Sequence, residues 1–291
     1  MLAMLASLPP MAHAQAEYLF PAADPWNFDQ NYVSASVADA QWTIDGVFPG
    51  TKLIIEGRYS FYRAQADPAK RDCACEPLPV PRKTIGTVSA HLQWGEGESG
   101  LEYGRLSVTS LGYTWIYETA RGEFRPLRDT LTWGGLQAGK DDPLGIKEYY
   151  EFSLVEGSRT WQWQPGESAF LFTLGVQGWV GYAWAKSVDP TYSEVSNPIV
   201  GSAFKATVNR PAWGQVYVEQ RVANGFTFSS PSAGGTVSRE ARFRAGYLNR
   251  VYRCLSLELY VEKRSFNFTD HRLDDLYTKS KRAGASLGCA F

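Results

Sequence analysis

Ala169 to Ala185 reads AFLFTLGVQGWVGYAWA, and this uncharged stretch decides the fold class. Its length is close to the roughly 20 residues with which an apolar helix crosses a bilayer. It also exceeds the roughly 9–11 residues that a tilted membrane strand requires. The stretch is therefore either a single-pass helical anchor or one strand of a β-structure, and the pattern within it separates these alternatives.

The alternation of side chains favours a strand. One parity holds the small or polar residues Thr173, Gly175, Gln177, Gly181 and Ala183, and the other holds Phe170, Phe172, Leu174, Val176, Val180, Tyr182 and Trp184. A period of two places these sets on opposite faces of a strand, and the interspersed glycines weaken a helix. We expect the aromatic residues near its two ends to lie at membrane interfaces, and any open volume of the protein to lie along its small, uncharged face.

The composition agrees with a β-rich chain. Among the 291 residues, 14% are aromatic and 20% are charged, and there are 27 glycines. Such a balance is typical of β-structures and of membrane barrels, in which only alternate residues face lipid. A net charge of −1 gives no electrostatic basis for binding nucleic acid.

Alternating segments recur along the chain, separated by polar, Gly- or Pro-containing connections. They span residues 41–47, 53–63, 87–94, 103–118, 129–138, 149–164, 169–185, 202–209, 213–222, 239–247, 251–268 and 279–291. Counted from the C-terminus, long connections at 269–278, 223–237 and 186–200 alternate with short ones at 248–250, 210–212 and 165–168. This predicts an all-β fold, a transmembrane antiparallel up-and-down β-barrel of about 12 strands, with about 10 or about 14 as alternatives. A soluble β-sandwich is the competing fold.

The C-terminal segment carries a family resemblance. In KSKRAGASLGCAF (279–291), Ala283, Ala285, Leu287, Cys289 and Phe291 share one parity. The chain here resembles bacterial outer-membrane β-barrels, whose last strand ends in an aromatic residue. The resemblance implies location in the outer membrane, contact with its lipids, and recognition by the barrel-assembly machinery through the strand that ends at Phe291. Other envelope proteins are candidate partners.

The N-terminus is consistent with export. Residues 1–14 are largely apolar and end in Ala12-His13-Ala14, an A-x-A-like cleavage site, so they are predicted to be a signal peptide, with an unstructured apolar N-terminus as the alternative. Residues 15–40 are predicted to be an irregular segment, and residues 41–291 to form the barrel.

The parity opposite the apolar one should face the barrel interior. It holds Glu56, Arg58, His91, Lys205, Glu219, Arg221, Arg242, Arg244, Glu258, Glu262 and Arg282. Their signs roughly alternate between strands, and neighbouring strands lie about 4.8 Å apart, so opposite charges can pair across the sheet. The charges either line a selective pore or, because buried charges are costly unless paired, fill a closed interior.

The sequence favours a channel over an enzyme. Neither G-x-S-x-G nor H-E-x-x-H occurs. His91 is better explained as a hydrogen-bonded lumen residue than as a base. His271 lies in a polar loop with Thr269, Asp270, Asp274 and Asp275, for which a solvated loop is favoured over a cation site. We therefore expect no catalytic residues, no cofactor and no metal site. The first hypothesis is a narrow, porin-like channel for small solutes. The alternatives are a closed barrel that serves as an anchor or assembly subunit, and a lipid-modifying enzyme.

Four cysteines suit an exported, oxidising context. Cys254 and Cys289 lie at the same rim of the last hairpin, but their parities disagree, so a bridge between them requires a bulge or a break in parity. Cys73 and Cys75 lie in the Pro-rich connection 64–86. For them a disulfide, within the pair or to the rim, is favoured over a site for a soft metal.

Overall fold

The fold consists of strands throughout the part of the chain that the structure describes. The computed structural model describes residues 31–42, 50–62, 82–95, 100–117, 122–141, 146–187, 195–210, 213–230, 234–252, 254–270 and 276–290. No helix long and apolar enough to cross a membrane occurs in these ranges. The strands are β1 (Tyr32–Trp42), β2 (Gly50–Tyr62), β3 (Arg82–Gly95), β4 (Leu101–Ile116), β5 (Arg125–Asp141), β6 (Ile146–Trp163), β7 (Leu171–Ser187), β8 (Val195–Arg210), β9 (Gly214–Ser230), β10 (Gly234–Tyr252), β11 (Leu255–Asp270) and β12 (Leu276–Ala290).

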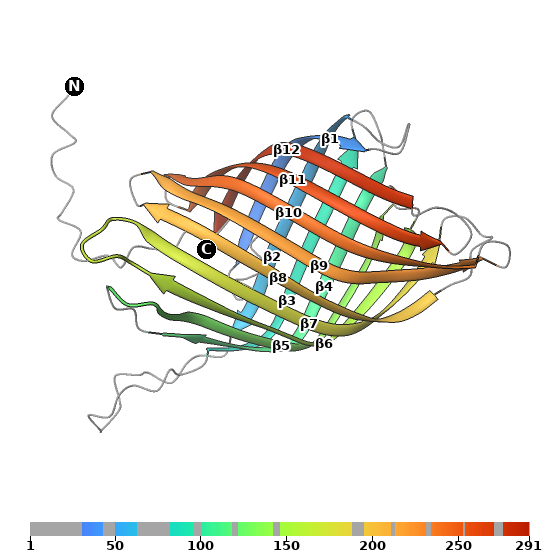
Figure 1. Cartoon of the computed structure of the whole chain (residues 1–291), viewed down its shortest axis with the longest axis horizontal. Coiled ribbons are helices and arrows are strands. Elements are labelled where there is room, and N and C mark those ends of the chain that lie inside the picture. Colours follow the sequence, from blue (N-terminus) through green and yellow to red (C-terminus); the bar gives the residue numbers. More distant parts are fainter. Residues whose placement is uncertain are drawn as a thin grey trace.

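These strands close into one barrel (Figure 1). Each strand pairs antiparallel with its neighbours in sequence, and β1 pairs antiparallel with β12, with Tyr32 opposite Ala290. Closure leaves no unpaired sheet edge, which a strand-built wall in lipid requires. The predicted antiparallel up-and-down barrel of about 12 strands is confirmed.

The stretch that opened the sequence analysis forms β7. Thr173 and Gln177 are each 5% exposed, whereas Val176 is 42% and Val180 41% exposed, so the predicted alternation is confirmed. One expectation about this strand is wrong. Trp179 also faces inward, where it is 5% exposed and packs in a buried apolar cluster, so this face is not uniformly small. The indole fills space that was expected to be open.

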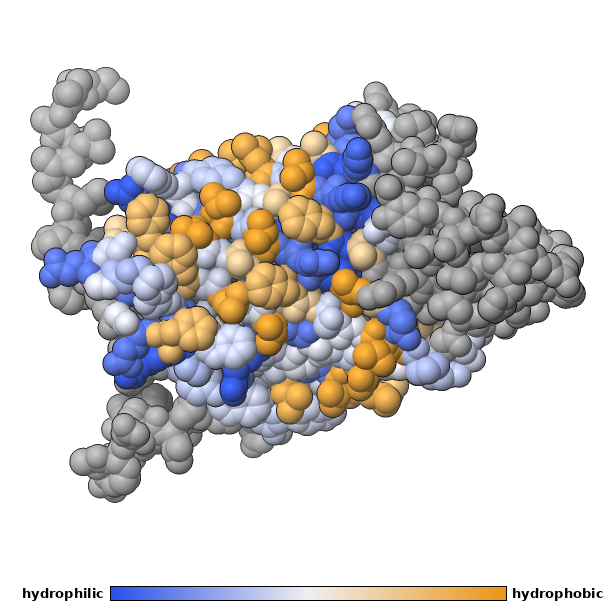
Figure 2. Space-filling view, in the orientation of Figure 1, coloured by the Kyte–Doolittle hydropathy of each residue, from blue (hydrophilic) through white to orange (hydrophobic). Residues whose placement is uncertain are grey.

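The outer wall of the barrel is apolar. Exposed aliphatic and aromatic side chains occur on every strand, and Figure 2 shows such side chains spread across the visible wall. Aromatic pairs lie toward both ends of the strands. Trp163 and Phe172 have ring centroids 5.4 Å apart near the β6–β7 turn, and Tyr150 and Trp184 lie 5.3 Å apart toward the other end. This arrangement is typical of a membrane barrel with two aromatic girdles.

The barrel begins earlier than the sequence pattern predicted. β1 occupies residues 32–42, so the prediction of an irregular segment is wrong for residues 32–40, and the predicted start of the barrel at 41 is also wrong. The inward residues of β1 include Ser34, Ser36 and Ala38, all buried. These small side chains give a weak alternation, and pairing with β2 and β12 specifies the strand instead.

The predicted asymmetry of the connections is also partly wrong. β9 continues to Ser230 and β10 begins at Gly234, so most of the expected long connection 223–237 is strand. Because neighbouring strands run in opposite directions, all even-numbered strands end at the same end of the barrel. The segment that follows β2 therefore starts at the end where the β6–β7 turn and Ala290 lie. The Pro-rich connection is thus attached at the same end as the short turns, and residues 63–81 lie outside the described ranges.

Candidate functional site

The predicted interior residues project from two groups of strands that lie on either side of β1. Glu56 and Arg58 lie on β2 and His91 on β3, while the other eight lie on β8 to β12. All of them lie on the less exposed parity of their strands, buried or half-buried. The structure therefore brings these residues of distant sequence together inside the barrel.

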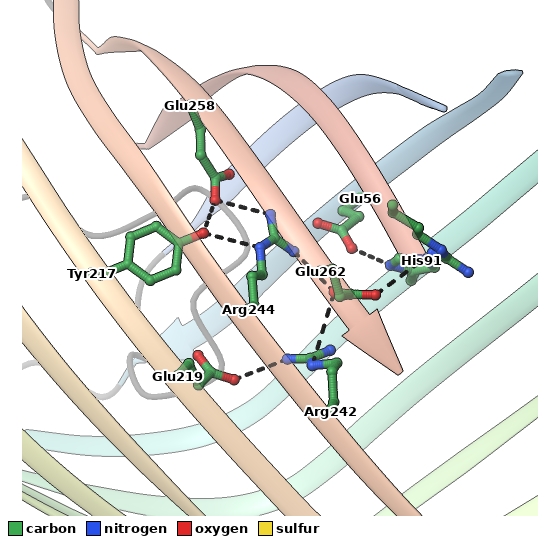
Figure 3. A network of polar contacts seen from close by, with 9 residues as sticks. Glu56, His91, Tyr217, Glu219, Arg242, Arg244, Glu258 and Glu262 are labelled. Carbon is green, nitrogen blue, oxygen red and sulfur yellow. Dashed lines mark hydrogen bonds and ion pairs between the residues drawn. The ribbon is translucent and has the colours of Figure 1, made fainter. Parts of the chain in front are cut away.

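Arg244 on β10 lies at the centre of a polar network (Figure 3). Its Nη2 donates a hydrogen bond to Glu258 Oε1 at 2.9 Å, and its Nε donates one to the Tyr217 hydroxyl at 2.9 Å. The same hydroxyl donates to Glu258 Oε1, so three side chains from β9, β10 and β11 form a closed triangle. Glu258 is almost fully buried, and these bonds offset the cost of removing its charge from water.

Glu262 on β11 joins further cations to this group. Arg244 Nη1 lies 3.8 Å, Arg282 Nη1 3.9 Å and Arg242 Nε 4.0 Å from its carboxylate oxygens. Arg242 Nη2 donates a 2.9 Å hydrogen bond to Glu219 Oε1. Three arginines therefore face three glutamates, and this network, which we call the Arg–Glu network, is balanced in charge. Its members are Arg242, Arg244, Arg282, Glu219, Glu258 and Glu262.

Side chains from β2 and β3 also approach the network. Glu56 on β2 hydrogen-bonds His91 Nδ1 on β3, and these side chains are 15% and 28% exposed. Arg244 and Arg242 interact electrostatically with the Glu56 carboxylate, although β2 and β10 are not adjacent strands. The charges on β2 and β10 therefore interact inside the barrel.

A second connection across the interior starts at β6. Glu156 accepts a hydrogen bond from Gln177 Nε2 on β7 and is attracted electrostatically by Arg221 on β9 and Arg58 on β2. Because β2 and β6 lie four strands apart, this attraction also crosses the lumen. Glu156 therefore belongs with the other interior charges, although β6 lies outside the strands predicted to carry them.

Aromatic rings line the wall between the charges in a repeated arrangement. Trp179, Tyr217 and Tyr260 each face an inward glycine on the next strand, which is respectively Gly201, Gly246 and Gly284. Each ring lies so close to its glycine that a Cβ there would overlap ring atoms. A cation covers each ring: Arg221 lies 4.0 Å from the centroid of Trp179, Arg244 4.0 Å from Tyr260 and Lys205 5.3 Å from Tyr217. The rings hold the cationic heads toward the lumen.

Other inward side chains are fully buried. Lys52 and Gln93, toward the end of the barrel opposite the C-terminus, are each 1% exposed. Toward the C-terminal end, Gln215 is 0% and Leu248 1% exposed. The partly exposed charges lie between these tightly packed positions, which makes the level of the Arg–Glu network the candidate functional site.

Sequence reasoning missed several interior residues. Tyr217 and Trp179 share parity with predicted inward residues, but aromatic character was assigned to the lipid side. Glu156 follows an irregularity between Ser153 and Val155, where Leu154 and Val155 are both exposed and the alternation changes phase. The parity of Tyr217, which matches that of Glu219 and Arg221, could have indicated its inward position. For Glu156 the bulge on β6 removed any such indication from the sequence. Among the described residues, no cluster of three His, Cys, Asp or Glu could hold a metal ion.

The two rim cysteines are joined in a disulfide. Cys254 and Cys289 are bonded, with Cα atoms 4.8 Å apart. The disagreement in parity is resolved because Cys254 precedes β11, which begins at Leu255, the residue that pairs with Cys289. A turn residue is not bound by strand alternation. A bridge from the Pro-rich connection to this rim is therefore excluded, and Cys73 and Cys75 lie outside the described residues.

Comparisons with known proteins find remote similarity to three solved structures. No family model and no curated protein sequence matches the chain. The chain is similar to a solved structure described as the TodX monoaromatic hydrocarbon channel, with 8% identity, a TM-score of 0.35 and coverage of 90% of each chain. It is also similar to OccD3 (OpdP) of Pseudomonas aeruginosa, with 8% identity, a TM-score of 0.26 and coverage of 90% of this chain and 91% of that one. An anion-selective porin from Comamonas acidovorans has 9% identity, a TM-score of 0.18 and coverage of 90% and 98%. At these scores, any function has to be argued from the residues of this chain.

Proposed function

We propose that this chain is an outer-membrane β-barrel that forms a narrow channel for small polar solutes. The observation that carries the proposal is that inward charged side chains on β3 and β10 remain partly exposed within the barrel. Arg242 is 27% and His91 28% exposed at the side chain, although both lie on the inward parity. A fully packed interior would bury them, so water reaches the level of the Arg–Glu network.

Membrane insertion is supported by the outer wall. Leu106 is 57%, Val200 57% and Leu154 54% exposed, on strands distributed around the barrel. A soluble protein rarely exposes large apolar side chains on every strand, whereas lipid covers them without cost. The predicted export signal and last strand support the outer membrane as the location.

The charge balance of the site indicates the kind of solute. Three arginines face three glutamates, so the interior offers both donors for carboxylates and acceptors for amines. A ring of one sign would select one sign of ion. We therefore expect weak discrimination between small cations and anions, and passage of compact polar or zwitterionic solutes.

Planar-bilayer recording tests this function. The wild-type protein should give small discrete conductance steps. The double variant Glu219→Ala/Arg242→Ala removes both members of one ion pair. The smaller side chains leave a wider lumen, so its conductance steps should be larger than those of the wild type. Lys263→Ala, an exposed outward position on β11, is the matched control and should conduct like the wild type. Folded protein that is silent in both the wild type and the double variant would contradict a channel.

A second candidate is a closed barrel that serves as an envelope anchor. It is favoured by the fully buried side chains on either side of the network, such as Lys52 and Leu248. The same recordings separate the two functions. A silent wild type whose double variant conducts would indicate a barrel that the Arg–Glu network seals.

A further inference from the structure

A charged cluster lies on the outer wall, away from the interior site. Thr130 and Ser158 hydrogen-bond to each other on the inward parity of β5 and β6. Alternation therefore turns their neighbours Asp129 and Arg159 outward, toward lipid. Arg159 is 50% exposed at the side chain, and its Nε and Nη2 donate to the two Asp129 carboxylate oxygens at 2.7 and 2.6 Å. An outward charged pair is expensive near the bilayer midplane and tolerated only near the interface.

The cluster lies at the level of the aromatic side chains near one end of the barrel. Asp129 is the fifth residue of β5, and Arg159 is the fifth from the end of β6. Beyond Arg159 on the same face come Trp161 and Trp163. This is the end that carries the β6–β7 turn and Ala290. Tryptophan and tyrosine concentrate at headgroup level in membranes, so the charged pair lies where lipid headgroups lie.

The cluster borders a pocket of about 350 Å³. Gly157 occupies the outward position between Arg159 and Val155 and leaves the space that a side chain would fill. The other walls include Trp115 and Tyr117 at the end of β4. The hydroxyl of Tyr117 donates a 2.7 Å hydrogen bond to Asp129 Oδ2, the oxygen that Arg159 Nη2 also bonds, which further fixes the carboxylate.

The geometry leaves the guanidinium available to a ligand. Asp129 receives three donors, two from Arg159 and one from Tyr117. Half of the Arg159 side chain remains exposed although it donates to Asp129. An exposed planar guanidinium binds phosphate oxygens well, and the orientation of this one is already set by Asp129.

We propose that this pocket binds the phosphate group of a glycerophospholipid in the membrane leaflet at the C-terminal end of the barrel. Arg159 binds the phosphate, the space over Gly157 holds the headgroup, and the Trp115 and Tyr117 rings lie along the boundary with the acyl chains. The inference rests on the proposed membrane location and not on conduction.

Native mass spectrometry of the detergent-solubilised protein with added phosphatidylglycerol tests the site. The wild type should retain one phospholipid. Arg159→Gln should weaken retention roughly tenfold or more, because it removes a charge-assisted hydrogen bond. Gly157→Leu should have a similar effect by filling the pocket. A Cβ at Gly157 would lie 3.7 Å from Thr130 O and 3.8 Å from Leu131 Cδ1, which are ordinary contacts, so this variant should fold.

Arg125→Gln is the matched control, because Arg125 is an exposed arginine paired with Glu123 near the same end of the barrel but outside the pocket. Equal retention by the wild type, both pocket variants and this control would overturn the inference. Displacement of the lipid by millimolar inorganic phosphate would show a free-anion site and would also overturn it. Lipid retention by a protein that is silent in bilayers would leave this inference standing while the channel fails.

Discussion

Individual glycines determine how close the interior aromatic rings lie to the barrel wall. Where a ring faces Gly246 or Gly284 on the next strand, it packs closely against the wall and lies within reach of a cation. Any larger residue at these glycines would push the ring into the lumen. The sequence does not show this coupling, because the two partners lie on different strands and meet only through register.

Gly246→Ala should destabilise the barrel by about 1–3 kcal/mol, the usual cost of forcing extra volume into a packed site. A Cβ there would lie 2.7 Å from Tyr217 ring atoms, so the ring must move and lose its bonds to Arg244 and Glu258. Urea unfolding in lipid vesicles, followed by tryptophan fluorescence, measures the change.

Gly178→Ala serves as the control for that experiment. Gly178 faces outward on β7, and a Cβ there would lie 3.8 Å from Gly201 O, an ordinary contact. We expect an unchanged or slightly raised unfolding midpoint. If the two alanine variants unfold alike, the packing of Tyr217 on Gly246 does not contribute to stability.

Among residues, the charged interior positions were predictable and several neutral or aromatic ones were not. A period of two assigns Glu258, Glu262 and Arg244 inward without knowledge of the fold. The inward position of Trp179 and Tyr217 was not predicted, because aromatic rings occur both against lipid and on the wall of a lumen. Glu156 was hidden by the bulge that precedes it.

At the scale of elements, the last hairpin is held by a covalent bond as well as by strand pairing. The Cys254–Cys289 disulfide joins the start of β11 to the end of β12, across a sequence separation of 35. It therefore lies at the seam where β12 also pairs with β1. Reduction of this disulfide should weaken the region where β12 pairs with β1 and closes the barrel.

Cys254→Ser should lower the free energy of unfolding by about 3–4 kcal/mol, the chain-entropy expectation for a loop of this length. The measurement is thermal unfolding followed by the mobility shift of heat-treated samples. The wild type in dithiothreitol should approach the variant. A variant as stable as the oxidised wild type would show that strand pairing alone secures the seam.

Strand existence was predictable where large apolar residues alternate with polar ones, as in β7 and β11. β1 was missed because its inward positions are serine and alanine, and its pairing with β12 depends on closure of the whole sheet. The length of β9 and β10 was underestimated because serine, glycine and proline near residue 231 indicate a loop although strand pairing continues to Ser230.

For the molecule as a whole, the division between lipid and lumen can be measured with native fluorophores. Trp163 faces outward and is 41% exposed, whereas Trp179 faces inward and is 5% exposed. In vesicles whose acyl chains carry bromine, Trp163→Phe should lower the fraction of tryptophan emission that is quenched. Trp179→Phe should raise that fraction slightly, because it removes an emitter that lipid does not reach.

Changes of the same sign in both variants would contradict the assignment of faces.

The closed barrel itself was predictable from the alternation of side chains, the even number of strands and the pattern of the terminal strand. The path of the lumen was not, because it depends on ion pairs between strands far apart in the sequence, such as the approach of Glu56 to Arg244.

The disulfide also changes the connectivity of the chain. With Cys254 bonded to Cys289, the backbone between them becomes a covalent ring that contains nearly all of β11 and β12. A single proteolytic cut anywhere within this ring opens it without releasing a fragment. Such a nicked protein would migrate as one species in non-reducing gels and separate only after reduction, so the closing strand would stay attached after a cut.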